Sequence, residues 1–503
     1  MKSSKISLLA LSGLLLLSTS CDKDLLEQVN PNEPSTGQFW NTANDADRAV
    51  LAVYSGQQIF STYSLYWHFA TTGRTDESFT STPDPFLNQY LVFRQVSSTD
   101  GRSAFLWNDT YRMIFRANQV LTKVPAIQMD EAVKKRILAE ALFLRGLCYY
   151  ELGLLFGNVP LVTTLADANT RVPQVTQDEV YAQVIRDLTE AKADLPLTYD
   201  ANNKGRATRG AAAALMGKVF MQQRRWAEAS TQFAEVISSG QYALVPNYAD
   251  NFTESNENNS ESVYEVQFSG VNKNFGQDFA GAAEGNERAQ FFSPFPIGFG
   301  DVEVRRWLFQ EFSDLTPSGG VDPRRDVTIF SATGTPRIYG QNFGLGGLNL
   351  NPSRMFWRKY ANDRTRTFED FFSGINIRLI RYADVLLMQA EALNEQGQTS
   401  AALPLLNQVR QRPSVGLVPL TGTFTQASMR EQIRHERVTE LAGEGVRWSD
   451  LVRYGLFDTA DGLNELRARD ADFNNFVAPR NKLLPIPQTD IDIDRNLRQN
   501  PGY

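Results

Sequence analysis

The sequence contains very few cysteine and histidine residues. Its two cysteines are Cys21 and Cys148, and its two histidines, His68 and His435, lie far apart with no further Cys or His at ligand spacing. A zinc site is therefore not expected. Two cysteines allow at most one disulfide within the chain, so packing must supply most of the stability.

The sequence also lacks an excess of basic residues and a second long apolar run. Its 503 residues include 50 Lys and Arg against 57 Asp and Glu, a net charge of −7. This balance provides no basic surface for nucleic acid. Outside residues 6–17, no apolar stretch approaches the ~20 residues that a membrane-spanning helix needs. A hydrophobic fraction of 42% is typical of a globular protein with a substantial core.

The N-terminus has the pattern of an export signal that ends at a cysteine. Two lysines precede the apolar run of residues 6–17, small residues occupy positions 18–20, and Cys21 follows. A basic start, a short apolar centre and a small-residue cleavage site are typical of a secretory signal rather than of a membrane span.

This segment resembles bacterial lipoprotein signals, in which the cysteine is lipidated and becomes the new N-terminus, although Ser18 stands where an aliphatic residue is more usual. We therefore predict a signal peptide over residues 1–20, lipidation of Cys21, and a polar tether over residues 21–38. Acylation of Cys21 would leave no intrachain disulfide. The alternative is a plain signal peptide with an incidental cysteine.

Several segments repeat apolar residues every three or four positions, which predicts amphipathic helices. They cover residues 131–153, 178–195, 208–223, 226–237, 382–395, 400–410 and 428–441. Thr176 is a suitable N-cap for the second segment. Arg224 and Arg225 alone separate the third segment, rich in small residues, from the fourth, so the two can pack as a close tetratricopeptide-like hairpin. We predict a mainly α fold built from stacked helical hairpins.

Residues 241–360 have a different character from the helical segments. They are rich in Gly, Asn, Pro and Phe and show little helical periodicity, which predicts loops with short strands. An irregular excursion within a helical scaffold is a common location for a binding site. We therefore expect one domain over residues 39–503, with a helical scaffold at about 39–240 and 361–503 and a loop-rich insertion between them.

Four segments, taken together, resemble the SusD-like (RagB/SusD) family of outer-membrane nutrient-binding lipoproteins. They are residues 139–146 continuing to 155–162, residues 377–395 (IRLIRYADVLLMQAEALNE), residues 433–455 (IRHERVTELAGEGVRWSDLVRYG), and residues 484–487 (LPIP) with the ending 499–503 (QNPGY). Their order behind a lipoprotein start extends the resemblance over nearly the whole mature chain. The resemblance implies a helical fold with tetratricopeptide-like hairpins and a loop-rich ligand-binding region, in agreement with the periodicity.

The same resemblance implies a function at the cell surface. Members of this family sit over a TonB-dependent, SusC-like outer-membrane barrel, capture an oligosaccharide, or in some members a peptide, and pass it to the barrel. It therefore implies a lipid-anchored protein on the outer membrane, facing the cell exterior, with a SusC-like transporter and an oligosaccharide as partners. One alternative is a peptide-binding lid, in which Asn286 or Arg288 meets a peptide terminus. Another is a lipid-anchored helical-repeat scaffold whose only partner is protein.

The charged residues near the C-terminus favour a structural role over catalysis. They are Glu436, Glu440 and Glu444, interleaved with Arg434, Arg437 and Arg447. The glutamates fall at four-residue steps on one face of a predicted helix, so we expect ion pairs with these arginines. A glycosidase instead needs two carboxylates that face each other at about 5–10 Å. We expect no enzymatic activity and no cofactor.

Acidic residues near the end of the chain imitate a calcium loop. Asp490, Asp492 and Asp494 have the spacing of the first ligands of such a loop, but the Gly and the distal Glu of the pattern are missing. We therefore expect no metal site here.

A glycan-binding site needs exposed aromatic rings for the apolar face of a sugar and polar side chains for its hydroxyl groups. Three segments outside the helical pattern combine these residue types. Their candidate ligand-binding residues are Phe86, Asn88 and Tyr90, then Asn286, Arg288, Phe291 and Phe292, then Tyr339 and Phe343. The same rings could instead pack the loops onto the scaffold. We expect at least two of them to line the site.

Overall fold

The computed structural model describes residues 39–94, 97–165, 170–271 and 284–503. The predicted signal peptide, the lipidation site Cys21 and the tether lie outside the described residues. Within these ranges, no helix has both the length and the hydrophobicity needed to cross a bilayer.

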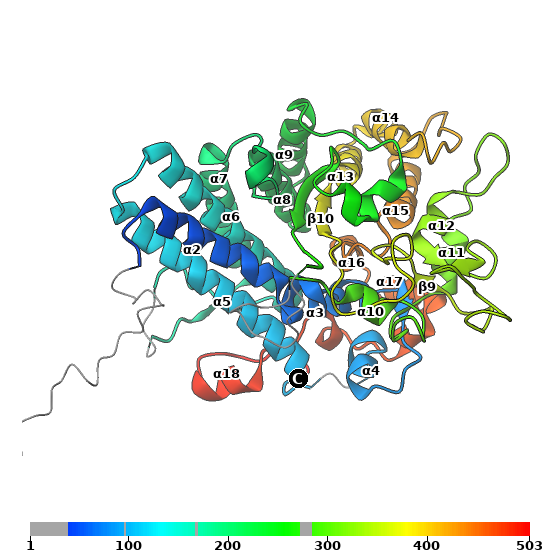
Figure 1. The fold of residues 1–503 in the computed structure, drawn as a ribbon, viewed down its shortest axis with the longest axis horizontal. Coiled ribbons are helices and arrows are strands. Elements are labelled where there is room, and N and C mark those ends of the chain that lie inside the picture. The colour runs from blue at the N-terminus through cyan, green and yellow to red at the C-terminus, as the bar shows by residue number, and fades with distance from the viewer. Residues whose placement is uncertain (1–38, 95–96, 166–169, 272–283) are drawn as a thin grey trace, which may run out of the picture.

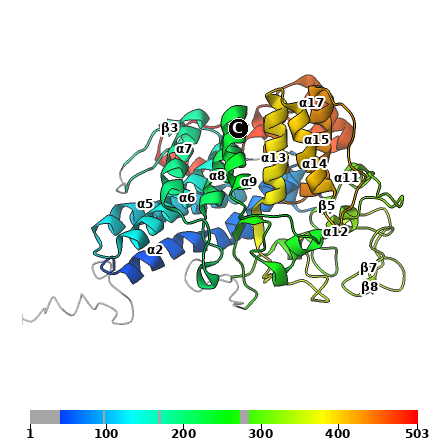
Figure 2. The ribbon, with the colours of Figure 1, turned by 90° about the horizontal axis from the view of Figure 1, so that it is seen from above.

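Helical hairpins form the scaffold of the molecule (Figures 1 and 2). The helices are α5 (Gly101–Lys123), α6 (Glu131–Phe156), α7 (Gln177–Asp194), α8 (Arg209–Gln222), α9 (Trp226–Ser238), α13 (Tyr382–Glu395), α14 (Thr399–Arg410) and α15 (Gln426–Leu441). From α5 to α9 each packs on the next, and α9 packs directly on α13, so the array continues across the insertion. The predicted hairpins are confirmed, and each predicted helix ends within three residues of its observed bounds.

Local sequence accounts for several helix ends and contacts. The Thr176 side chain accepts a hydrogen bond from the backbone of Glu179, and the Glu179 side chain bonds back to Thr176, which completes a capping box. Gly217 lets α8 and α9 approach closely, because a Cβ atom there would lie 2.4 Å from the Phe233 ring. The small residues of α8 therefore set the spacing of this hairpin.

Helix α6 is more deeply buried than its predicted single apolar face suggests. From Ala139 onward nearly all of its side chains are buried, because α5 and α7 pack on it together with α2 (Ala43–Ser55). A buried Arg145 on this helix donates two hydrogen bonds, of 2.7 and 2.8 Å, to the Asp187 carboxylate on α7. The sequence patterns did not identify α2 or α5.

The insertion contains short elements, as predicted. Its helices are α10 (Arg288–Phe292), α11 (Arg306–Glu311) and α12 (Arg324–Thr328). A four-stranded antiparallel sheet has the order β1 (Ser78–Phe79), β5 (Glu303–Val304), β9 (Phe356–Trp357), β6 (Ile329–Phe330), and β7 (Arg337–Ile338) pairs with β8 (Gln341–Asn342). Strand β4 (Ser262–Val266) pairs antiparallel with β10 (Ile377–Arg381), immediately before α13, and so joins the insertion to the scaffold.

The remaining elements close the ends of the scaffold. They are α3 (Tyr66–His68) and α4 (Pro85–Leu91), the β2–β3 pair (Val159–Pro160 and Gln174–Val175), and the C-terminal helices α16 (Arg447–Tyr454), α17 (Ala460–Arg469) and α18 (Gln488–Ile493). Two π-helical turns, Phe60–Ser64 and Phe69–Gly73, flank α3. In Figure 1, α3 lies near the centre of the molecule, and α10 and α4 lie below it.

Candidate functional site

The structure buries six of the nine predicted ligand-binding residues. They are Tyr90, Asn286, Arg288, Phe292, Tyr339 and Phe343, each at most 3% exposed. The Tyr90 hydroxyl donates to Asp100 at 2.7 Å, and the Arg288 guanidinium donates to the Lys359 carbonyl and stacks on the Phe292 ring at 4.5 Å. These side chains anchor loops to the scaffold and expose almost no surface to a ligand, and their contact with a ligand stays a prediction.

Two of these residues belong to a small separate core within the insertion. Tyr339 and Phe343 pack with Phe330 and Phe356. The Tyr339 hydroxyl also contacts the Glu369 carboxylate. In this loop-rich segment the aromatic rings pack against one another, and this packing removes their apolar surface from water.

The other three predicted residues are accessible to different degrees. Phe86 is 48% exposed, with the Arg102 guanidinium 4.4 Å from its ring centre. Phe291 is half-buried on α10. The half-buried Asn88 amide donates to the carbonyls of Thr82 and Asp84, at 3.1 and 2.8 Å, and so serves α4. Phe86 and Phe291 remain as candidates for ligand contact.

Phe291 lies at the centre of a cluster of rings, here called the aromatic shelf. The shelf consists of Phe60, Tyr66, Phe291, Phe299 and Phe371. Ring centres are 4.6 Å apart for Phe60 and Tyr66, 6.4 Å for Phe60 and Phe291, 5.1 Å for Phe291 and Phe299, and 5.8 Å for Phe299 and Phe371. Phe60 is 36% and Phe299 44% exposed, so the shelf presents apolar ring surface to solvent.

Three separate parts of the chain supply the shelf. Phe60 and Tyr66 come from the first π-helical turn and α3, Phe291 and Phe299 from α10 and the following loop, and Phe371 from the loop before β10. Phe60, Tyr66 and Phe371 were not among the predicted ligand-binding residues. The dense run of aromatic residues over positions 60–69 was a possible signal, but residue type does not show which of these rings are exposed and which are buried.

Charged side chains border the shelf. Asp84 lies 3.6 Å from the Arg102 guanidinium, which also stands 5.9 Å from the Tyr66 ring centre. The Asp301 backbone donates to the Phe291 carbonyl at 2.9 Å, and burial, assisted by the nearby charge of Asp84, raises the pKa of the Asp301 carboxyl to about 6. The shelf thus combines apolar ring faces with a polar rim, the composition that sugar binding requires.

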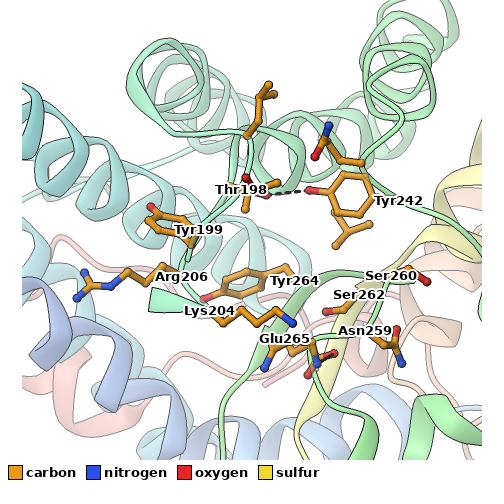
Figure 3. Close-up of a pocket in the computed structure, with 16 residues that line it drawn as sticks. Thr198, Tyr199, Lys204, Arg206, Tyr242, Asn259, Ser260, Ser262, Tyr264 and Glu265 are labelled. Carbon is orange, nitrogen blue, oxygen red and sulfur yellow. Dashed lines mark hydrogen bonds between the residues drawn. The ribbon is translucent and has the colours of Figure 1, made fainter. Parts of the chain in front are cut away.

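A separate hollow of about 320 Å³ opens between the α7–α8 connection and β4 (Figure 3). Tyr199, Tyr242 and Tyr264 line it. The Tyr242 hydroxyl is 2.9 Å from the Thr208 hydroxyl, and the buried Tyr264 hydroxyl donates to Gln57 at 2.9 Å. Two of its three tyrosines thus already have protein partners, so we regard the aromatic shelf as the better candidate site.

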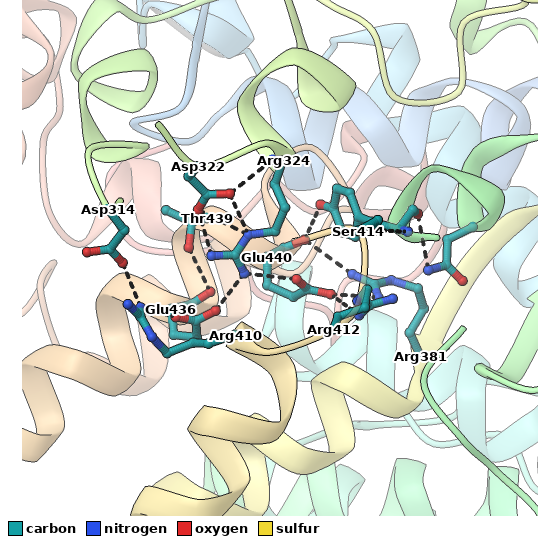
Figure 4. A network of polar contacts seen from close by, with 12 residues as sticks. Asp314, Asp322, Arg324, Arg381, Arg410, Arg412, Ser414, Glu436, Thr439 and Glu440 are labelled. Atoms are coloured by element: carbon teal, nitrogen blue, oxygen red, sulfur yellow. Dashed lines mark hydrogen bonds and ion pairs between the residues drawn. The ribbon is translucent and has the colours of Figure 1, made fainter. Parts of the chain in front are cut away.

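The glutamates of α15 form part of a buried ionic network (Figure 4). Glu440 accepts hydrogen bonds from Arg412 at 2.7 Å, Arg324 at 3.0 Å and Arg381 at 3.1 Å. Glu436 accepts from Arg324 at 2.5 Å and from Arg410 at 2.9 Å. Burial alone would raise the pKa of Glu440, but Arg412, Arg381 and Arg324 outweigh it and hold the value at about 2. A carboxylate kept ionised in this way is not suited to act as a general acid.

The predicted ion pairing of these glutamates is confirmed, but the predicted partners, the arginines interleaved with them in the sequence, are wrong. Arg437 bonds Asp384 and Asp450, and Arg447 bonds Asp76. Glu444 lies beyond the end of α15 and bonds Lys359. The arginines around Glu436 and Glu440 come from α12, β10 and the end of α14, because these segments cover the buried face of α15.

The acidic residues near the C-terminus do not gather into a metal site. Asp490 and Asp492 lie on α18, where Asp492 accepts a hydrogen bond from Gln488 at 2.9 Å. Among the described residues, no group of three or more His, Cys, Asp and Glu side chains could hold a metal ion.

Two family models match the chain. One, described as "Starch-binding associating with outer membrane", matches residues 47–221, and the other, the SusD family, matches residues 346–503. The chain is 28% identical to SusD-like protein P25 of Formosa agariphila, over 92% of this chain and 93% of the relative.

Solved structures show the same fold. A SusD superfamily protein from Bacteroides vulgatus superposes with a TM-score of 0.82 at 24% identity, over 92% of this chain and all of that one. A laminarin-binding SusD-like protein superposes with a TM-score of 0.75 at 29% identity, again over 92% of this chain and all of the other. The helical hairpins, the order of the sequence motifs and these matches agree: the chain is a SusD-like protein.

Proposed function

We propose that the protein is a lipid-anchored receptor on the outer surface of the outer membrane, which captures an oligosaccharide and delivers it to a TonB-dependent, SusC-like transporter. The observation that carries this proposal is the aromatic shelf, a set of partly exposed rings with a polar rim. Sugar rings have apolar C–H faces that stack on such surfaces, while their hydroxyl groups bond polar side chains.

The comparisons support a carbohydrate ligand. One matching family model is described as starch-binding and associated with the outer membrane, and one similar solved structure is a laminarin-binding protein. We further propose that residues 1–20 are the signal peptide, that Cys21 carries the lipid, that residues 21–38 form the tether, and that residues 39–503 form the single domain.

The peptide-binding alternative receives less support. It requires Asn286 or Arg288 to meet a peptide terminus, and both side chains are buried, at 0% and 1% exposure. The Asn286 amide donates to the Ile375 carbonyl at 2.6 Å, and Arg288 also donates to the Gly443 carbonyl at 3.1 Å. These groups attach the insertion to the scaffold.

Calorimetric titration tests the ligand class. The mature protein in detergent is titrated with laminarihexaose, maltohexaose, xylohexaose and mannohexaose, and with short peptides as the contrast. We expect saturable binding of at least one glycan with millimolar to micromolar affinity, because two or three partly exposed rings bury little surface and association itself is costly. Binding of peptides alone would contradict the proposal.

Co-purification tests delivery to a transporter. The protein, carrying an affinity tag at its C-terminus, is extracted from membranes of the native cell with mild detergent. We expect a TonB-dependent barrel to co-purify in near-equal amount. If the protein binds glycan but no such barrel co-purifies, the binding role stands and the proposed delivery role is refuted.

A further inference from the structure

Glu287 holds two parts of the aromatic shelf together. Its backbone N–H donates to the Ser64 carbonyl at 3.3 Å and to the Ser64 hydroxyl at 3.1 Å, and its carbonyl accepts from the backbone of Phe291 at 3.4 Å. Burial and the nearby charges of Asp100 and Glu287 raise the pKa of the Tyr66 phenol, while Arg102 lowers it. The backbone bonds place Glu287 between Ser64 of the first π-helical turn and Phe291 of α10.

The Glu287 carboxyl has an unsatisfied polar atom. Its Oε2 is buried and has no hydrogen-bond partner among the described residues, although the residue as a whole is only half-buried, unlike its neighbours Asn286 and Arg288. Burial raises the pKa of Glu287 to about 8, so the group is mostly a neutral acid at pH 7. Buried polar atoms nearly always have partners in folded proteins, so an unpartnered one beside exposed rings requires an explanation.

The charges around the shelf disfavour an anionic ligand. Besides Glu287, the charged residues described at its edge include the acids Asp84, Asp301 and Asp370 and the cations Arg102 and Arg366. Arg102 lies against Asp84 at 3.6 Å and Arg366 against Asp370 at 2.9 Å. Each guanidinium therefore already faces a carboxylate, and an incoming carboxylate or sulfate would meet repulsion from the Asp301 carboxylate.

We propose that Glu287 is a specificity-determining residue of the shelf: its carboxyl hydrogen-bonds a sugar hydroxyl, and the site accepts uncharged glycans while it rejects glycans that carry carboxylate or sulfate groups. This inference rests on the proposed function. A neutral carboxyl both donates and accepts hydrogen bonds, as a sugar hydroxyl does. A carboxylate or sulfate group can only accept hydrogen bonds, and it would be placed near the ionised Asp301 carboxyl.

Titrations of two Glu287 variants test the inference. Glu287→Gln keeps a donor and an acceptor, whereas Glu287→Met keeps the size and removes both. The same neutral hexaoses are titrated together with laminarin sulfate and an alginate hexamer. Glu190→Met, a change of the same kind at an exposed position on α7, is the matched control.

We expect the wild-type protein to bind a neutral hexaose and neither anionic glycan. Glu287→Gln should bind within about twofold of wild type, and Glu287→Met should bind about 5- to 10-fold more weakly, the usual effect of one lost hydrogen bond. The melting temperature of Glu287→Met should be unchanged or higher, because the variant removes an unpaired buried polar group. A residue with a merely structural role would show the opposite change.

Several results would overturn this inference alone. They are unchanged affinity in Glu287→Met, binding of an anionic glycan as tight as that of its neutral counterpart, and a fall in melting temperature with equal loss of binding in both variants. If any of these results is obtained while alanine variants of the shelf rings Phe60 and Phe299 lose glycan binding, the proposed function stands. If the wild-type protein binds no glycan of either class, the proposed function and the inference fail together.

Discussion

Removal of two exposed rings from the aromatic shelf should weaken glycan binding without unfolding the protein. Phe60 and Phe299 are suitable because they are 36% and 44% exposed and both make ring contacts with Phe291. Their unsubstituted neighbour Phe291 is half-buried and contributes to the core. The alanine variants therefore remove surface that a sugar could cover and leave most of the packing intact.

The size of the effect follows from the exposed area. A phenylalanine offers roughly 150–250 Å² in total, so the exposed part of each ring is about 70–90 Å². At about 25 cal/mol per Å², complete coverage by a sugar would contribute about 2 kcal/mol, and half coverage about 1 kcal/mol. Each single variant should then bind about fivefold more weakly, and the double variant Phe60→Ala/Phe299→Ala about 25-fold.

Titration calorimetry with the glycan that binds wild type measures this change. The matched control is Phe115→Ala, because Phe115 is 50% exposed on α5, about 20 Å along that helix from the Arg102 end near the shelf. The control should bind like wild type. If the double variant retains wild-type affinity, the rings of the shelf are not the contact surface and the reasoning is refuted.

Three further predictions concern stability and anchoring. Glu440→Gln should lower the free energy of unfolding by about 3–5 kcal/mol, read from urea midpoints, because it leaves three buried guanidinium groups undercompensated; an unchanged midpoint would contradict this. Burial alone would lower the pKa of His435, but its bonds to Asp314 and Glu311 raise it to about 9, so its stabilising contribution is complete below about pH 6.5 and is lost as the pH rises through about 9. The urea midpoint should fall over that range in wild type and less in His435→Gln, and equal falls would exclude this group as the cause. Cys21→Ser should abolish fatty-acid labelling and release the protein from the membrane fraction, whereas retained labelling would place the lipid elsewhere.

The sequence alone was sufficient to predict the helical scaffold. Helix-forming patterns are local, so the 3.6-residue period located α13 at Tyr382–Glu395, and Thr176 marked the start of α7 through its own hydrogen bond to the following turn. Helices α2 and α5 were not predicted. Polar residues interrupt the buried face of α5, and the buried face of α2 is short, with only four small apolar residues. The ordered family motifs predicted the fold that the solved relatives share.

The candidate site could be predicted only in part. Phe86 and Phe291 are accessible as expected, but the same reasoning selected Tyr90 and Phe292, which are buried. Residue type shows that a ring can stack on a sugar. It does not show whether another segment already covers that ring.

Sequence by itself determined the properties that depend on near neighbours along the chain: the N-terminal lipoprotein pattern, the helices and their caps, and the loop-rich character of residues 241–360. The tertiary structure alone decided the properties that depend on distant segments. It brought Phe60 to Phe291, gave Glu440 its arginine partners, and left the Glu287 Oε2 without a partner in the part of the chain that the structure describes. The physical reason is that solvent exposure and ion pairing depend on which distant segments pack against each other. The local periodicity of the sequence does not specify those contacts.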